Sequence, residues 1–125
     1  MINKGLFTSN TDVWSTPPDF YKKLDDEFHF DFDPCPLNPK FDGLEIQWKA
    51  RNFMNPPYGR VIGKWVKKAS ENPTTVCLLP ARTDTKWFHD YIYGKAEIRF
   101  IKGRLKFGGS KNSAPFPSMV VIFKK

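Results

Sequence analysis

The sequence predicts an α/β fold with a mostly parallel sheet and an antiparallel addition at its C-terminal edge. Two strand, loop and helix units follow one another between residues 51 and 92, which is typical of parallel strands covered by helices. After residue 96, strand-like stretches follow without a helix between them, which favours antiparallel pairing. A chain of 125 residues buries roughly two thirds of its unfolded surface, so residues 1–125 are expected to form a single domain.

The N-terminal part begins with an arm, residues 1–13. A helix is predicted over about residues 17–27, because two prolines suit its first turn and apolar side chains follow at helical spacing. Residues 28–32 alternate apolar and polar side chains and stop at Asp33, which a proline follows. This pattern predicts a short strand with Asp33 at its carboxyl end.

The middle of the chain contains the first complete unit. Residues 36–50 are rich in Pro, Asn, Asp and Gly, which predicts a loop with one helical turn near residues 44–48. Residues 51–54 form a second predicted strand, which runs into Asn55. One apolar stripe then predicts an amphipathic helix over about residues 60–71.

The second unit starts with residues 75–80, a nearly continuous apolar run typical of a strand buried on both faces. Thr83 or Asp84 can cap the helix that follows. The buried side of that helix would carry Trp87, Phe88, Tyr91 and Ile92. The final strands are predicted at residues 97–101, 104–107 and 119–123, with a flexible Gly/Pro-rich loop at 108–117.

The loops after the predicted parallel strands are expected to converge. Ligands of such sheets bind beyond the carboxyl ends of the strands, so Asp33, Asn55 and Pro80 should line one crevice. An amine conjugated to a planar ring is a poor nucleophile until its lone pair is freed from the ring. The Asn55 side-chain oxygen and the Pro56 carbonyl could accept its two hydrogens, with Pro57 stiffening the loop further.

The overall composition limits the partners and the compartment. Lys and Arg number 20 against 13 Asp and Glu, and the net charge of +7 favours a polyanionic partner such as nucleic acid. Cys35 and Cys77 make no disulfide framework, and no signal peptide precedes them, so a cytoplasmic protein is expected. No apolar run approaches the roughly 20 residues of a membrane helix. His29 and His89 lack ligand-like spacing with the cysteines, so no metal site is expected.

Six stretches of the chain resemble one known family. They are Trp-Ser-Thr-Pro at 14–17, Asp-Phe-Asp-Pro-Cys at 31–35, Asn-Pro-Pro-Tyr at 55–58, Leu-Pro-Ala-Arg-Thr-Asp-Thr-Lys-Trp-Phe at 79–88, Phe-Ile-Lys-Gly-Arg-Leu-Lys-Phe at 100–107 and Ala-Pro-Phe-Pro-Ser at 114–118. Together they resemble the small phage-type DNA N6-adenine methyltransferase (Dam-like) family. This resemblance implies a reduced Rossmann-like fold and methyl transfer from S-adenosylmethionine to the N6 amine of an adenine flipped out of double-stranded DNA. A phage-encoded chain would act in the host cytoplasm.

The resemblance also implies roles for individual residues. The catalytic loop would consist of Asn55, Pro56, Pro57 and Tyr58, with Tyr58 stacking on the flipped base. The contacts to S-adenosylmethionine would come from Thr16, Pro17, Asp33, Pro34, Cys35 and Asp42. The candidate DNA contacts are Arg82, Lys86, Trp87, Lys102, Arg104, Lys106 and Phe116. The loop after Asp33 lacks the glycine-rich continuation of larger methyltransferases.

Two other functions remain open. The Asn-Pro-Pro-Tyr loop suits any planar conjugated amine, so RNA or a protein glutamine is an alternative substrate, although the charge of +7 argues against protein. A noncatalytic nucleic-acid-binding module of the same fold is the second alternative, because the cofactor loop is short. The sequence indicates neither a recognition sequence nor an oligomeric state.

Overall fold

The structure, a computed structural model, describes residues 13–108 and 113–124. In chain order its elements are α2 (Pro18–Phe28), β1 (Asn52–Met54), α3 (Ile62–Glu71), β2 (Thr75–Pro80), the short π-helix η1 (Phe88–Ile92), β3 (Glu97–Phe100) and β4 (Ser118–Phe123). Residues 1–12 of the predicted arm and 109–112 of the predicted loop lie outside the described residues. Within the described part, no helix is long and apolar enough to cross a membrane.

The four strands form one mixed sheet in the order β1-β2-β4-β3. β1 pairs with β2 in parallel, whereas β4 pairs antiparallel with both β2 and β3. The prediction of a mostly parallel sheet is therefore wrong, although the antiparallel pairing of the C-terminal strands is confirmed. The reason is burial: every residue of β4 is buried, so this strand takes a central position, whereas the more exposed β3 takes the edge.

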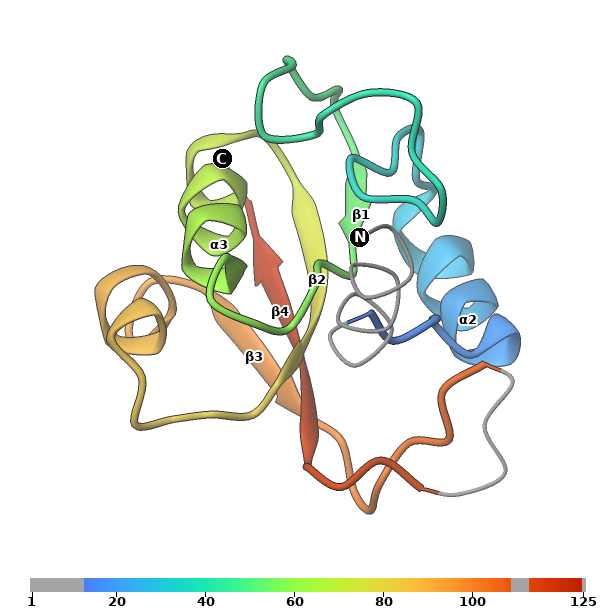
Figure 1. The fold of residues 1–125 in the computed structure, drawn as a ribbon, viewed down its shortest axis with the longest axis vertical. Coiled ribbons are helices and arrows are strands. Elements are labelled where there is room, and N and C mark those ends of the chain that lie inside the picture. Colours follow the sequence, from blue (N-terminus) through green and yellow to red (C-terminus); the bar gives the residue numbers. More distant parts are fainter. Residues whose placement is uncertain (1–12, 109–112, 125) are drawn as a thin grey trace, which may run out of the picture.

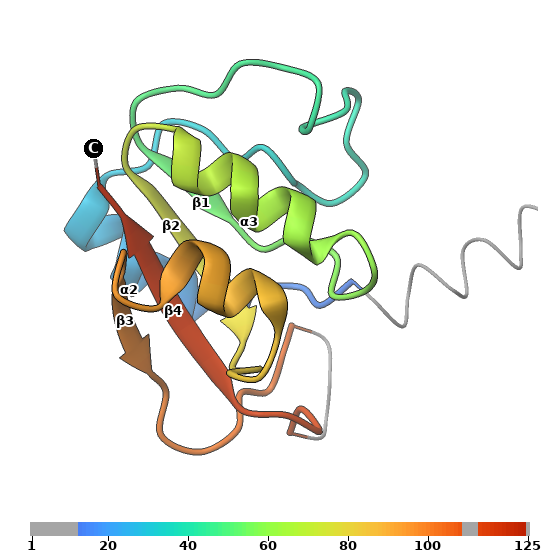
Figure 2. The same ribbon diagram turned by 90° about the vertical axis from the view of Figure 1, so that its left-hand side faces the viewer.

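Helices cover both faces of the sheet. Figure 1 shows the strands in the centre, with α3 on one side and α2 on the other. Figure 2, turned by 90°, shows α3 and η1 in front of the sheet and α2 behind it. This is the layered arrangement expected of an α/β fold.

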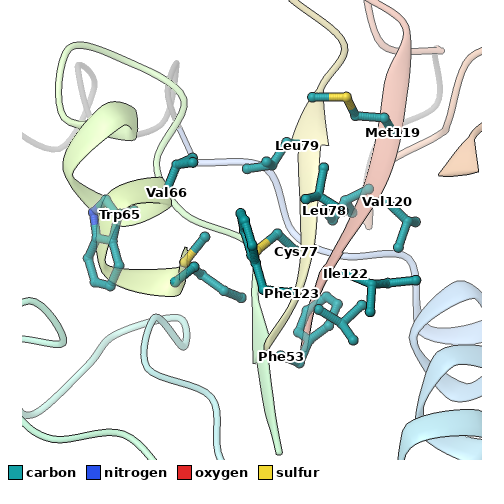
Figure 3. Packing of buried hydrophobic residues seen from close by; sticks show 14 of the residues in the cluster. Phe53, Trp65, Val66, Cys77, Leu78, Leu79, Met119, Val120, Ile122 and Phe123 are labelled. Atoms are coloured by element: carbon teal, nitrogen blue, oxygen red, sulfur yellow. The ribbon is translucent and has the colours of Figure 1, made fainter. Parts of the chain in front are cut away.

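The two faces of the sheet carry separate sets of core side chains. Alternate residues of a strand point to opposite faces, so Cys77 and Leu79 of β2 share one face. Val66 of α3 packs on that side (Figure 3). On the other face, the ring of Phe53 contacts that of Tyr21 from α2, with ring centroids 5.0 Å apart. Both faces are dry, since Val66, Cys77 and Leu79 on one face are fully buried and Phe53 on the other is 2% exposed.

The predicted strand at residues 28–32 is reduced to a single bridge. Helix α2 continues to Phe28, and His29 ends it in the left-handed conformation, with φ of 54° and its N–H donating to Asp25 O. Only Phe32 then pairs, through a parallel bridge to Asn52. The helix therefore takes residues that the apolar and polar alternation assigned to a strand.

Three further local predictions are corrected. Thr85, rather than Thr83 or Asp84, caps the helix after β2, since its hydroxyl accepts the Phe88 N–H at 3.3 Å. Residues 104–107 form no strand; they follow a turn at Gly103, where φ is +77°. In place of the helical turn expected near residues 44–48, a hydrogen-bonded turn covers residues 42–45. Its Glu45 N–H donates to Asp42 O at 2.9 Å.

Candidate active site

The loop Asn55–Tyr58 lies at the carboxyl end of β1, between that strand and α3. Because the bridge between Phe32 and Asn52 is parallel, the chain leaves it toward Asp33 at the same end of the sheet. Asp33 and Asn55 consequently line one cavity, as the sequence predicted. Two segments that are far apart in the sequence thus meet at one edge.

The cavity has a volume of about 640 Å³. The predicted site residues that line it are Thr16, Asp33, Pro34, Cys35, Asp42, Asn55 and Pro57. Those that do not line it are Pro17, Pro56 and Tyr58, together with Pro80, which was expected in the same crevice. The chain after Pro80 is held toward β4, since the Ala81 N–H donates to Pro117 O at 2.9 Å.

Sequence reasoning missed several apolar residues of the lining. They include Val13 and Trp14 from the N-terminal segment and Leu37 and Phe41 from the loop after Asp33. Val13, Leu37 and Phe41 remain exposed to 38%, 59% and 37% although they are large and apolar. The sequence signal for these residues is the presence of large apolar side chains inside an otherwise polar loop. The packing of a loop does not require such side chains, so they indicate a binding surface.

The side-chain amide of Asn55 is held in one orientation. Its Nδ2 donates to the Trp14 carbonyl and, at 2.9 Å, to Thr16 Oγ1. Its Oδ1 is buried and accepts no hydrogen bond from any described residue. A buried acceptor without a partner is costly and rare, so it points to a missing ligand group.

Asp33 and Cys35 form the polar part of the same wall. The Cys35 N–H donates to Asp33 Oδ1 at 2.8 Å. Burial raises the pKa of Asp33 to about 6, and the Cys35 N–H opposes this only in part. Burial likewise raises the pKa of the Cys35 thiol to about 12, so this thiol stays protonated at neutral pH. Within the described residues, no cluster of three or more His, Cys, Asp or Glu side chains could hold a metal ion.

Gly43 fixes the loop that closes the cavity from the other side. A Cβ atom on Gly43 would lie 1.9 Å from Pro34 O and 2.7 Å from the Trp65 ring, so only glycine fits this close approach. The Trp48 indole N–H donates to Gly43 O at 2.7 Å and holds the loop there. The loop therefore packs directly on the segment that follows Asp33.

Tyr58 is buried rather than open to the cavity. Its ring contacts Phe107 and Phe116 edge-on, with ring centroids 6.4 Å and 5.6 Å apart. Its hydroxyl donates to Leu78 O at 2.9 Å, and burial raises its pKa well above the usual range. The stacking role stays a prediction, because a base could reach the ring only if Phe107 and Phe116 moved.

Comparison with known proteins identifies the family. The profile of the family described as DNA N-6-adenine-methyltransferase (Dam) matches residues 4–125. The chain belongs to this family. The DNA N-6-adenine-methyltransferase of Haemophilus phage HP1 (strain HP1c1) is 28% identical over 147 aligned residues, which cover 99% of this chain and 85% of the relative. No solved structure matches the chain.

Membership of the Dam family confirms the enzyme class predicted from the sequence, a DNA adenine methyltransferase. It also implies that DNA is the substrate. The phage origin of the relative agrees with the predicted resemblance to phage-type enzymes.

The predicted DNA contacts of this Dam-family enzyme differ in the ion pairs, hydrogen bonds and core contacts that their side chains already make. Lys86 forms an exposed ion pair with Asp90. Trp87 and Phe116 are half-buried and pack against the core. Alanine or glycine could not replace these two rings without loss of packing, so their first role is structural.

The exposed cations beside the loop after β3 are freer. Lys102 and Lys106 make no side-chain hydrogen bond or ion pair with the described residues, and neither does Arg82 after β2. Arg104 reaches only the Ala114 carbonyl, at 3.4 Å. These four side chains are available to phosphates in a way that Lys86 is not.

Proposed function

We propose that the chain binds S-adenosylmethionine in the cavity of about 640 Å³ and methylates the N6 amine of an adenine flipped out of double-stranded DNA. The observation that carries this proposal is the buried Asn55 Oδ1, which lacks a partner among the described residues. A hydrogen of the target amine is the donor that this oxygen needs. The proposal includes a reduced Rossmann-like fold, which the successive units β1–α3 and β2–η1 support.

The cavity suits S-adenosylmethionine in size and chemistry. Small-molecule sites usually measure roughly 300–1,000 Å³, and this cavity falls within that range. The Asp33 carboxylate would pair with the cofactor's ammonium group beside Pro34 and Cys35, and Asp42 is the candidate contact to its adenine. When bound, the cofactor would supply a methyl group whose carbon–sulfur bond breaks, with its electron pair going to sulfur, as the nitrogen–carbon bond forms.

Asn55 and Pro56 would prepare the amine. The Asn55 Oδ1 would accept one amine hydrogen, and the Pro56 carbonyl, to which no described group donates, would accept the other. Holding both hydrogens turns the nitrogen lone pair away from the ring system. The proton can leave after transfer, so alignment is the main task, and alignment can contribute about 7–11 kcal/mol.

Tyr58 is the proposed stacking residue for the flipped base. An adenine amine in a duplex is paired, so the base must leave the stack before Asn55 can hold it. Stacking on an aromatic ring is worth roughly 1–3 kcal/mol, which would offset much of the few kcal/mol that flipping costs. Phe107 and Phe116 would have to move aside as the base enters.

The test is transfer of a labelled methyl group from S-adenosylmethionine to four substrates: duplex DNA with adenine, DNA without adenine, RNA and protein. We expect label only in the adenine-containing DNA. Label only in RNA or protein would establish an alternative substrate. Absence of label together with salt-sensitive DNA binding would favour a noncatalytic module.

Asn55→Ala should abolish transfer while the dissociation constant of S-adenosylmethionine changes little, because this side chain acts on the target amine. Asn72→Ala is the matched control, since the Asn72 side chain donates only to Lys68 O and lies at the C-terminal end of α3, whereas the Asn55–Tyr58 loop precedes the N-terminal end of that helix. An equal loss of cofactor affinity in Asn55→Ala would contradict the assignment.

A further inference from the structure

The amide nitrogen of Asn55 has both of its hydrogens engaged by one short segment. One hydrogen goes to the Trp14 carbonyl and the other to the Thr16 hydroxyl oxygen, at 2.9 Å. An amide NH₂ group has only two hydrogens to donate. The nitrogen is therefore saturated, whereas Oδ1 accepts nothing from the described residues.

The Trp14 carbonyl decides which way the amide faces. A carbonyl can only accept, so a flipped Asn55 amide would place two oxygens against each other and lose the bond. The Thr16 hydroxyl can accept or donate, so it does not choose the orientation by itself. It supplies the second acceptor, which prevents the amide from rotating about a single hydrogen bond.

The segment that carries these two acceptors is itself fixed. The Gly108 N–H donates to Ser15 O at 2.8 Å. The Trp14 ring lies against Phe107 and Phe116, with ring centroids 5.4 Å and 5.1 Å apart. Contacts to Phe107, Gly108 and Phe116 therefore support the two acceptors.

We propose that Thr16 is a positioning residue for Asn55: together with the Trp14 carbonyl, its hydroxyl turns the amide so that Oδ1 faces the target amine. This rests on the proposed function of Asn55. This role differs from the cofactor contact that the resemblance implies for Thr16, and it is argued from the hydrogen bond that the Thr16 hydroxyl oxygen accepts from the catalytic loop. Through this bond Thr16 acts on the side of the target base.

The test compares Thr16→Val with Thr16→Ser. Valine keeps the shape and loses the acceptor, so kcat should fall about fivefold to tenfold, as expected for one lost hydrogen bond. The dissociation constant of S-adenosylmethionine should stay within about twofold. Thr16→Ser keeps the hydroxyl and should restore most of the rate. Thr74→Val is the matched control, since the Thr74 hydroxyl makes no hydrogen bond with the described residues and lies at the opposite end of β2.

A second measurement does not depend on activity. In the isotope-labelled, cofactor-free wild-type protein, both Asn55 side-chain amide hydrogens should exchange slowly with solvent, and in Thr16→Val one of them should exchange faster. Fast exchange of both hydrogens in the wild type would overturn the proposal even if Thr16→Val failed to fold. A weaker cofactor affinity with unchanged kcat would overturn it too, and would return Thr16 to the cofactor.

The outcomes separate this proposal from the proposed function. If the wild type transfers no methyl group to DNA, the function of the site is wrong, whatever Thr16 does. If the wild type is active and Thr16→Val is equally active, only the positioning role is wrong.

Discussion

The Tyr58 hydroxyl donates a 2.9 Å hydrogen bond to the Leu78 carbonyl and so joins the Asn55–Tyr58 loop to the central strand β2. The paired register of β1 and β2 ends at Met54 and Cys77, one residue before Leu78. The tyrosine thus extends the contact between the loop and β2 beyond the last pair of the ladder. The geometry of the Asn55–Tyr58 loop is tied to the sheet at both of its ends.

Tyr58→Phe should lower the free energy of unfolding by about 1 kcal/mol, because it leaves the buried Leu78 carbonyl without this donor. It should keep most of the methyl transfer, since the ring remains. Urea denaturation and kcat of the same preparations would check both. Tyr93→Phe is the control, since Tyr93 is 66% exposed. Unchanged stability of Tyr58→Phe would contradict the structural role of this bond.

Asp33 should make the stability depend on pH. Its pKa is raised from 3.8 to about 6, so the folded state prefers the protonated carboxyl. Its contribution to the unfolding free energy is fully present below about pH 4 and is lost as the pH rises through about 6. Asp33→Asn should therefore gain roughly 1–3 kcal/mol on the wild type between about pH 4 and 7.5. Urea denaturation at both pH values measures this, and a constant difference would refute it.

The same carboxyl should give the cofactor affinity the opposite pH dependence. Pairing with the ammonium of S-adenosylmethionine requires the ionised form, so affinity should rise with pH through about 6 and then level off. Asp33→Asn should bind more weakly at neutral pH and lose the dependence. Calorimetric titration between about pH 5 and 8 would reveal it, and an equal slope in the variant would exclude Asp33 as the partner.

Gly43→Ala should change the shape of the cavity, because Gly43 belongs to the loop that forms part of its wall. The added Cβ would lie 1.9 Å from the Pro34 carbonyl, so the loop must move, and such overpacking costs about 1–3 kcal/mol. The affinity for S-adenosylmethionine should fall together with the unfolding free energy. Gly63→Ala in α3 is the control, since its Cβ would meet Trp87 only at ordinary contact distances. Unchanged cofactor binding in Gly43→Ala would contradict the place of this loop in the site.

Neutralising Lys102 or Lys106 should weaken DNA binding and reduce its salt dependence by about one counterion each. Lys22→Ala, which removes an exposed lysine paired with Asp26 on α2, is the control. The measurement is the slope of log affinity against log salt concentration for each variant. Slopes equal to that of the wild type would place the DNA elsewhere on the surface.

Local patterns predicted the elements that local chemistry decides. Helix α3 and strand β2 follow directly from an apolar stripe and a buried run, and the structure has them nearly where expected. The central place of β4 was not predictable in this way. It depends on which strand covers β2 most completely, and this is settled by contacts between residues about 40 positions apart.

The candidate site likewise contains residues that local sequence patterns predict and contacts that depend on distant parts of the chain. Asp33 and Asn55 could be predicted, because each follows a stretch with a strand pattern and carries a side chain suited to a ligand. The contact between Asn55 and the Trp14 carbonyl could not be predicted. Every residue has a carbonyl, and no sequence pattern indicates which one will face Asn55. The burial of Tyr58 was missed for a similar reason, since Phe107 and Phe116 reach it from a distant loop.

The central position of β4 also sets the order of events during synthesis. β2 and β3 do not pair with each other: β2 pairs with β1 and β4, whereas β3 is joined to the sheet through residues Ser118–Phe123. A nascent chain that still holds this segment inside the ribosome has an uncovered apolar edge on β2 and an unattached β3. We therefore expect the sheet to be completed only after β4 has been translated, and a nascent chain stalled before that point to be exposed to aggregation and proteolysis.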